Sequence, residues 1–245
     1  MVASSAPRYA IIDTLRGAAI WLMFVYHFSW DLTYFGFADF GVVTNPYWLW
    51  FARFIAGTIL LVMGMSQAIS AEREFNRKTF LKRFAVIGAC AAAISLGTYL
   101  MDPNTFIFFG ILHHIALVSL AMPLLVRLQT QTLVTLALLG LISPMFFEHE
   151  IFLVEWLWWA GLSPVTPAAL DYVPILPWIG VSLIGVVIGR QLFTGHPSHI
   201  FGEWQPANTA TRLIHLAGRH SLLLYMIHQP ILFGGVYGVY WMLYG

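Results

Sequence analysis

Two side chains near the end of the first apolar segment have the types and the spacing of a general base and its orienting group. His27 and Asp31 stand four residues apart, so on a continuous helix the carboxylate lies one turn from the imidazole. A carboxylate in that position fixes the tautomer of the ring and raises its basicity. A lone histidine on an apolar helix is more often a satisfied core residue, so the spacing leaves both interpretations open.

Asp13 and Arg16 stand at the other end of the same segment, three residues apart. On a helix they either pair with each other or bind an anionic ligand. At the helical rise of 1.5 Å per residue, the distance from Asp13 to His27 is roughly 21 Å, which is most of the thickness of a bilayer core. The two polar groups are therefore expected at opposite faces of a membrane.

Three more histidines stand in apolar segments. His113 and His114 are adjacent, and adjacent helical positions diverge by about 100°, so at most one is expected to face the same pocket as His27. His228 precedes Pro230 in the last apolar segment, about two helical turns from its start. It either closes the proline kink with a hydrogen bond or contributes to a binding site.

Arg53 and Trp30 are candidates for contact with a substrate at the depth of His27. Arg53 either binds an anionic group there or pairs with Asp31 or Asp39.

The elements that position these residues must be membrane helices. Of the 245 residues, 59% are hydrophobic and 9% are charged, against roughly 25% charged in a soluble domain. One core of this length cannot bury that much apolar surface, so the surplus faces lipid. The chain is predicted to be one all-α domain, residues 1–245, with about seven transmembrane helices. Apolar runs predict these at about 10–29, 48–70, 83–100, 108–126, 132–147, 172–192 and 219–243.

Charge alternates between successive loops. Residues 31–46, 101–104 and 148–171 hold no Lys or Arg. The other loops carry the basic residues, namely Arg8, Arg73, Arg77, Lys78, Lys82, Arg83, Arg127, Arg190, Arg212 and Arg219. The positive-inside rule then predicts a cytoplasmic N-terminus and an outer C-terminus in the inner (plasma) membrane.

Composition also excludes some classes of ligand and partner. The net charge of +1 excludes nucleic acid, which needs a concentrated basic face. The single cysteine, Cys90, allows no intramolecular disulfide and no Cys-based metal site, and no metal is expected.

Residues 1–9 lack the pattern of a secretory signal, so the first helix is expected to stay in the mature protein. Residues 151–161 are too short to span and are expected at the outer interface.

Glycine spacing predicts close helix packing. Gly185 and Gly189 form a small-xxx-small pair, and Gly57 with Gly64 offers a second close-contact face.

Four segments together resemble the signature set of the transmembrane acyltransferase superfamily. They are DTLRG at 13–17 followed by His27, LLVMGMS at 60–66, FGILHH at 109–114 and GRHSLLLYMIH at 218–228. The chain is most similar to bacterial relatives of heparan-alpha-glucosaminide N-acetyltransferase, with the type-3 acyltransferases as cousins. Arg16 matches the first-helix arginine of the family, and His27 matches the first-helix histidine of the type-3 branch. The heparan enzyme has an Asn-like position there and a histidine further on, where this chain has none.

The resemblance implies transfer of an acyl group, usually acetyl from cytoplasmic acetyl-CoA, to a hydroxyl or amine of a glycan or other envelope acceptor. His27 would act as the base with Asp31 behind it, and His113 or His114 would donate to the developing oxyanion. The cytoplasmic mouth would hold the donor through Asp13, Arg16, Arg212, Arg219 and His228. The oligomeric state is left open.

Two other functions fit the polar residues in the spans. A transporter or lipid flippase also has polar groups at both faces, but it has no reason to bind acetyl-CoA. A haem protein would ligate iron through His27 and His113 or His114, and it would show a Soret band.

Overall fold

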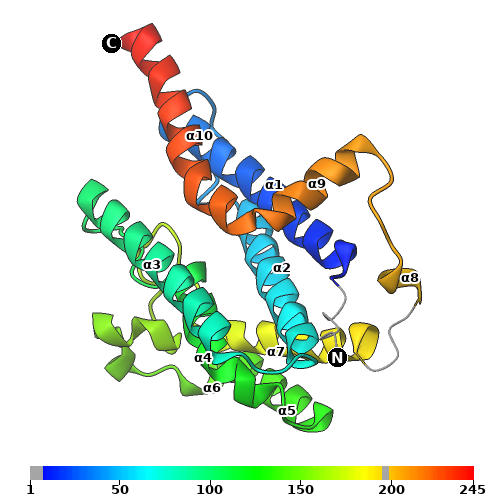
Figure 1. Ribbon diagram of the computed structural model, residues 1–245. Coiled ribbons are helices and arrows are strands. Elements are labelled where there is room, and N and C mark those ends of the chain that lie inside the picture. The colour runs from blue at the N-terminus through cyan, green and yellow to red at the C-terminus, as the bar shows by residue number, and fades with distance from the viewer. Residues whose placement is uncertain (1–7, 195–198) are drawn as a thin grey trace. The chain divides into compact units, whose positions relative to one another are not determined.

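Helices form every element of regular secondary structure in the part of the chain that the computed structural model describes, residues 8–194 and 199–245 (Figure 1). The all-α prediction is confirmed for these ranges. Residues 1–7, which hold most of the segment used to argue against a secretory signal, lie outside them.

Five helices are long and apolar enough to cross a bilayer: α1 (Ala10–Tyr34), α2 (Pro46–Ala71), α3 (Arg77–Met101), α7 (Ile175–Phe193) and α10 (Ser221–Tyr244). Two shorter apolar helices are α4 (Ile111–Leu125) and α5 (Thr130–Ile142). Each of the seven predicted segments falls on one of these helices. At 1.5 Å per residue, α4 and α5 measure only about 20 Å, less than the roughly 30 Å of a bilayer core.

The fifth predicted segment, 132–147, is not one helix, which corrects the sequence analysis. Helix α5 ends at Ile142, and a separate short helix, α6 (Pro144–Phe147), follows. Proline has no N–H to donate and suits the first turn of a helix, so Pro144 begins a new element.

The tryptophan-rich segment is not a span, as predicted. It folds into two 3₁₀ helices, η1 (Glu150–Leu153) and η2 (Glu155–Ala160). The remaining elements are α8 (His199–Gly202) and α9 (Thr209–Arg219).

The chain divides into two compact units, which are described separately. The middle unit comprises Leu60–Gly202 with Arg8, and the terminal unit comprises Tyr9–Ile59 and Glu203–Gly245. Helix α2 contributes its first half to the terminal unit and its second half to the middle unit.

In the middle unit, glycines let α2 and α7 approach closely. A Cβ on Gly64 would collide with the backbone of Ser182, and one on Gly185 would collide with the backbone of Leu61. Gly189 lies against Met65 in the same way. The predicted packing role of Gly64, Gly185 and Gly189 is confirmed.

In the terminal unit, α9 packs on the first half of α1. The side chain of Asn208 accepts a hydrogen bond from the backbone N–H of Thr211 and caps α9. A Cβ on Gly17 would collide with the carbonyl of Ile214, and one on Gly218 would collide with that of Asp13. The sequence analysis did not predict α9.

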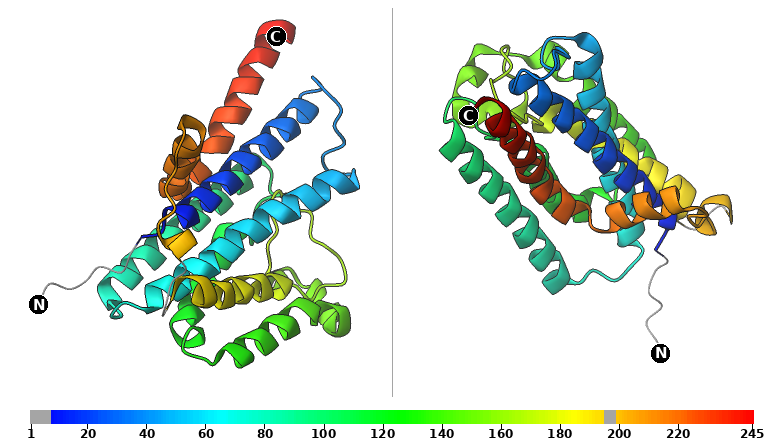
Figure 2. Two further views of the ribbon diagram at one scale, coloured as in Figure 1. Left: turned by 90° about the vertical axis from the view of Figure 1, so that its right-hand side faces the viewer. Right: turned by 90° about the horizontal axis from the view of Figure 1, so that it is seen from above.

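Helix α10 runs beside α1 in the same direction (Figure 2). His27 contacts His228, and further along Phe35 contacts Tyr237, with ring centroids 4.7 and 5.9 Å apart. Because α9 occupies the first turns of α1, α10 begins about three turns further along α1. This offset decides which side chains of the two helices meet.

Candidate active site

Four polar side chains from α1 and α10 lie together in the terminal unit. The ring centroids of His27 and His228 are 4.7 Å apart, and the rings meet edge to face. One turn further along α1, Asp31 is 0% exposed, and its Oδ1 accepts a hydrogen bond of 2.7 Å from Nε2 of Gln229. We call these four residues the histidine cluster.

The hydrogen bond of His228 fixes which ring nitrogen carries the proton. Its Nδ1 lies 2.6 Å from the carbonyl oxygen of Tyr225. A carbonyl only accepts, so Nδ1 donates, and in the neutral ring Nε2 is left with a lone pair. Phe24 stacks on the same ring, with centroids 5.5 Å apart, and holds its plane. His228 therefore presents an oriented, basic nitrogen inside the cluster.

Three polar atoms of the cluster are buried without a hydrogen-bond partner in the described structure: Oδ2 of Asp31, Nε2 of His228 and Oε1 of Gln229. An unmet buried polar group costs about 1–3 kcal/mol, so a fold seldom keeps three of them in one place without use. All three act as hydrogen-bond acceptors. The cluster is therefore suited to a group that brings hydrogen-bond donors, such as an amine or a hydroxyl.

His228 is a correction to the predicted site. The sequence analysis grouped it with the cytoplasmic arginines, whereas the structure places it against His27. The predicted separation assumed that α1 and α10 begin at the same level. Helix α9 shifts α10 along α1 and removes that separation.

The structure also shows the contacts of Asp31 and Arg53. Helix α1 continues past Asp31, so the carboxylate stands one turn from His27 as predicted. Its Oδ1 accepts a hydrogen bond from Gln229, and its Oδ2 has no partner in the described structure. Arg53 lies over the ring of Trp50, with its guanidinium carbon 5.1 Å from the ring centroid. The structure thus pairs Arg53 with an aromatic ring rather than with Asp31.

Trp30, the other predicted substrate contact, stacks on Tyr34 with centroids 5.1 Å apart.

The residues of the predicted donor site lie on α1 and α9. Arg16 pairs with Asp13 at 2.7 Å, as the three-residue spacing allows. Arg212 and Arg219 lie on α9 and are exposed. Because Asp13 neutralises part of the charge of Arg16, the exposed arginines of α9 supply the stronger attraction for phosphate.

His113 and His114 belong to the middle unit, where both rings have hydrogen-bond partners. Nδ1 of His113 accepts from the backbone N–H of Gly110 at 3.2 Å, and its Nε2 lies 3.0 Å from Oγ of Ser95. The bond from Gly110 gives the backbone N–H of the N-cap residue an acceptor at the start of α4. His113 therefore has a clear structural task.

His114 is fully buried on the same helix. Its Nδ1 lies 3.1 Å from the carbonyl oxygen of Pro174, and its Nε2 lies 3.4 Å from Oγ of Ser182. These contacts join α4 to α7. The two adjacent histidines thus point to different partners, as the predicted divergence of about 100° requires.

Sequence reasoning missed Gln229 as a member of the site. The available signal was its position beside His228 and Pro230 in an otherwise apolar segment, where an amide needs a partner. Within residues 8–194 and 199–245, no three His, Cys, Asp or Glu side chains gather closely enough to hold a metal ion.

Several helices of this length and apolarity indicate a multi-pass membrane protein, and the polar cluster is buried in its terminal unit. A family model described as "Heparan-alpha-glucosaminide N-acetyltransferase, catalytic" matches residues 8–230. The chain belongs to this family, and it is an acetyltransferase-like transmembrane enzyme. Comparison with curated proteins gives no match, and comparison with solved structures gives none.

Proposed function

We propose that this enzyme transfers an acetyl group from cytoplasmic acetyl-CoA to a hydroxyl or amine of a glycan or other envelope acceptor. In this proposal residues 1–245 act as one polytopic domain in the inner membrane, with seven spans, the N-terminus in the cytoplasm and the C-terminus outside. The family match and the apolar helices support a membrane acetyltransferase. The donor, the acceptor and the topology are our inference.

The histidine cluster is the observation that carries the proposal. Nε2 of His228 and two more unpartnered acceptor atoms lie beside the His27 ring, and together they suit an acceptor that arrives as a hydrogen-bond donor. Oδ2 of Asp31 and Oε1 of Gln229 would hold its N–H or O–H groups. His27, matching the first-helix histidine of the type-3 branch, would take the proton of the attacking group.

The chemical step is a direct acyl transfer. The acceptor nitrogen or oxygen forms a bond to the thioester carbonyl carbon while its proton moves to a ring nitrogen of His27. The tetrahedral intermediate then expels the CoA thiolate, which takes the proton from the imidazolium. General base catalysis of this kind contributes typically 10²–10⁴-fold in rate.

The donor would lie with its phosphates at the N-terminal end of α1. Arg16, Arg212 and Arg219 supply the positive charge, and Asp13 fixes the position of Arg16 through their ion pair. Guanidinium groups bind phosphate oxygens in pairs. The acyl arm would extend along α1 toward His27, roughly 17 Å from Arg16 at the helical rise.

To act as an oxyanion donor, His113 or His114 would have to give up a hydrogen bond that it makes in this structure and donate to the acyl carbonyl instead. Their hydrogen bonds to Ser95, Pro174 and Ser182 favour a structural task instead. The base is therefore placed at His27.

Acetyl-CoA binding and turnover test the proposal directly. The purified protein is expected to unfold at a higher temperature with acetyl-CoA, because a ligand at 100 times its Kd adds about 2.7 kcal/mol of stability. With an amino sugar or polyol present, it is expected to release CoA faster than without. A protein that neither binds acetyl-CoA nor releases CoA would instead fit the transporter alternative.

Arg16→Ala tests the donor site. This variant is expected to fold with a lower unfolding temperature, because Asp13 loses its partner, and to bind acetyl-CoA more weakly. Lys82→Ala, which removes a positive charge from α3, serves as the matched control. Equal affinity in Arg16→Ala and Lys82→Ala would place the phosphates elsewhere.

A further inference from the structure

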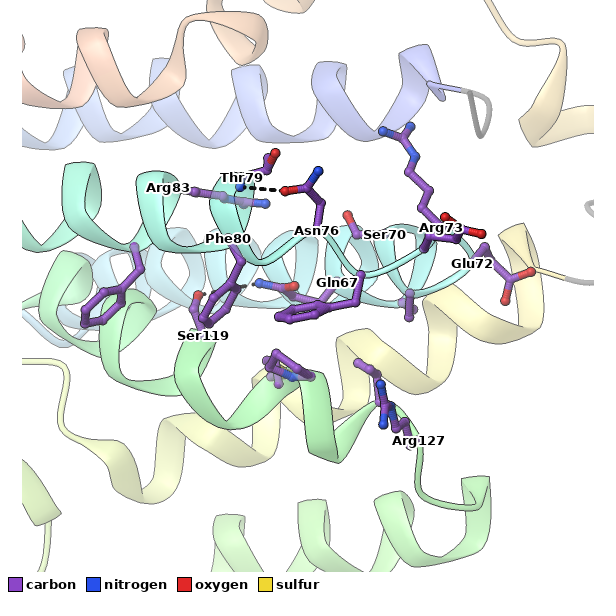
Figure 3. Close-up of a pocket in the computed structure, with 18 of the residues that line it drawn as sticks. Gln67, Ser70, Glu72, Arg73, Asn76, Thr79, Phe80, Arg83, Ser119 and Arg127 are labelled. Carbon is purple, nitrogen blue, oxygen red and sulfur yellow. Dashed lines mark hydrogen bonds between the residues drawn. The ribbon is translucent and has the colours of Figure 1, made fainter. Parts of the chain in front are cut away.

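A cavity of about 700 Å³ lies in the middle unit, where the end of α2, the start of α3 and the ends of α4 and α7 meet (Figure 3). Its volume is within the range of about 300–1,000 Å³ that is typical of small-molecule sites. It is separate from the histidine cluster, which belongs entirely to the terminal unit. Neither the sequence motifs nor the proposed function uses it.

Arginines dominate the charge of this cavity. Arg73, Arg83, Arg127 and Arg190 line it, together with the acidic Glu72 and Glu74. These arginines come from three basic stretches that are far apart in the sequence, and the fold brings them to one place. Figure 3 shows Arg83 on α3, Arg73 after α2 and Arg127 after α4.

Arg190 has a structural task at the end of α4. Its Nη1 donates to the carbonyl of Leu128 at 2.6 Å, and its Nη2 donates to the carbonyl of Val126. It thereby satisfies two carbonyls at the C-terminal end of α4. Arg83 and Arg127 are exposed at the cavity, and from there both guanidinium groups can approach a ligand.

The rest of the lining is partly polar and partly apolar. Gln67 donates to Ser119 at 3.5 Å on one wall. The rings of Phe75 and Phe80 lie 5.4 Å apart on another wall, and Met122 is fully buried. A ligand that fits such a lining carries an anionic group next to an apolar one.

We propose that this cavity binds a phosphate group that is attached to an apolar moiety, with Arg83 and Arg127 as its cationic ligands. Two sources have this chemistry. One is an anionic phospholipid, since basic pockets between membrane helices bind such head groups. The other is a soluble nucleotide, whose base can stack on a phenylalanine ring.

Binding measurements on the purified full-length protein in detergent test the site. The probes are phosphatidylglycerol, the zwitterionic phosphatidylcholine, and adenosine 3′,5′-bisphosphate. Phosphatidylglycerol or the bisphosphate is expected to raise the unfolding temperature of the wild-type protein, whereas phosphatidylcholine is not. A response to phosphatidylglycerol alone assigns the phosphate to lipid, and a response to the bisphosphate alone assigns it to a soluble nucleotide.

Two double variants test whether the arginines of the cavity bind the probe. The double variant Arg83→Gln with Arg127→Gln is expected to bind the active probe at least tenfold more weakly, because each charged hydrogen bond contributes about 1.5–3 kcal/mol. Arg77→Gln with Lys78→Gln removes the same charge from the start of α3 without touching the cavity lining, and it is expected to bind normally. Equal loss in both doubles would reduce the effect to net charge and overturn the proposal.

A single variant replaces the double variant if the latter does not fold. In that case Arg127→Gln alone is measured, because Arg127 lies beyond the end of α4. Unchanged affinity in that variant, or no response of the wild-type protein to any probe, would also overturn the proposal. Because no readout involves acyl transfer, a failure of the proposed enzymatic function does not affect these results.

Discussion

The imidazole of His228 meets that of His27 with 4.7 Å between the ring centroids, while its own Nδ1 proton goes to the carbonyl of Tyr225. Two side chains that are 201 residues apart in the sequence thus lie in direct ring contact. The tautomer of His228 is set by its own helix, so its other nitrogen can serve the site. This arrangement makes the contributions of the two rings separable by mutation.

His228→Asn separates a structural role from a chemical one. The asparagine amide can still donate to the Tyr225 carbonyl, but it offers no basic nitrogen. We expect this variant to unfold near the wild-type temperature and to lose at least tenfold in kcat/KM for acyl transfer, with His228→Ala losing stability as well. Full activity in His228→Asn would leave His228 with a packing role only.

His27→Ala is expected to reduce acyl transfer by at least 100-fold, because it removes the proposed base. Acetyl-CoA affinity, measured by thermal shift, is expected to remain within about threefold, because the proposed phosphate ligands lie roughly 17 Å or more away along α1. His220→Ala is the matched control, since His220 is exposed where α9 meets α10. Equal activity in the two variants would refute His27 as the base.

Asp31→Asn tests the carboxylate of the cluster. The amide can keep a hydrogen bond to Gln229, but it turns one unpartnered acceptor into a donor. We expect a milder loss of kcat/KM than in His27→Ala, expressed mainly as a higher KM for the acceptor. A loss confined to kcat would instead show that Asp31 acts on the proton transfer itself.

Gly218→Ala tests the contact that places α10. Its Cβ would meet the carbonyl of Asp13, and overpacking of this kind costs about 1–3 kcal/mol. The unfolding temperature should fall and activity should fall with it. Gly234→Ala in α10 adds the same atom where nothing lies within 4 Å, and it should be neutral or stabilising by up to about 1 kcal/mol.

Asp102, which ends α3, gives a pH-dependent prediction. Hydrogen bonds from the Thr105 hydroxyl at 2.7 Å and the Asn104 N–H at 3.0 Å lower the pKa of this carboxyl below its ordinary value of 3.8. Its contribution to stability is therefore present above pH 3.8 and is lost as the pH falls below that value. The difference in unfolding temperature between wild type and Asp102→Asn should shrink from pH 5 to pH 3. A constant difference would contradict this.

Hydropathy located the helices well because lipid makes each spanning segment apolar on every side. It missed α9 because only one face of that helix is apolar, around Ile214 and Ala217. The local signal was Asn208 followed by Thr211, which forms a capping box. A helix of this kind is recognised by periodicity and capping, and a search for long apolar runs passes over it.

The candidate site was predictable only where it depends on one helix. The spacing of His27 and Asp31, and of Asp13 and Arg16, follows from helical geometry alone. The contacts of His228 and Gln229 depend on the offset between α1 and α10, which α9 sets through Gly218. No local sequence pattern encodes that offset.

The common direction of α1 and α10 also restricts the number of times that the chain crosses the membrane. Two parallel helices that both cross a bilayer enter it from the same side, so the chain between them must cross an odd number of times. Counting α1 and α10 themselves, the total is odd. Five long helices satisfy this condition, and so do seven with α4 and α5 added, whereas six would not. If α4 and α5 differ in whether they cross, one further crossing must be sought elsewhere in the chain.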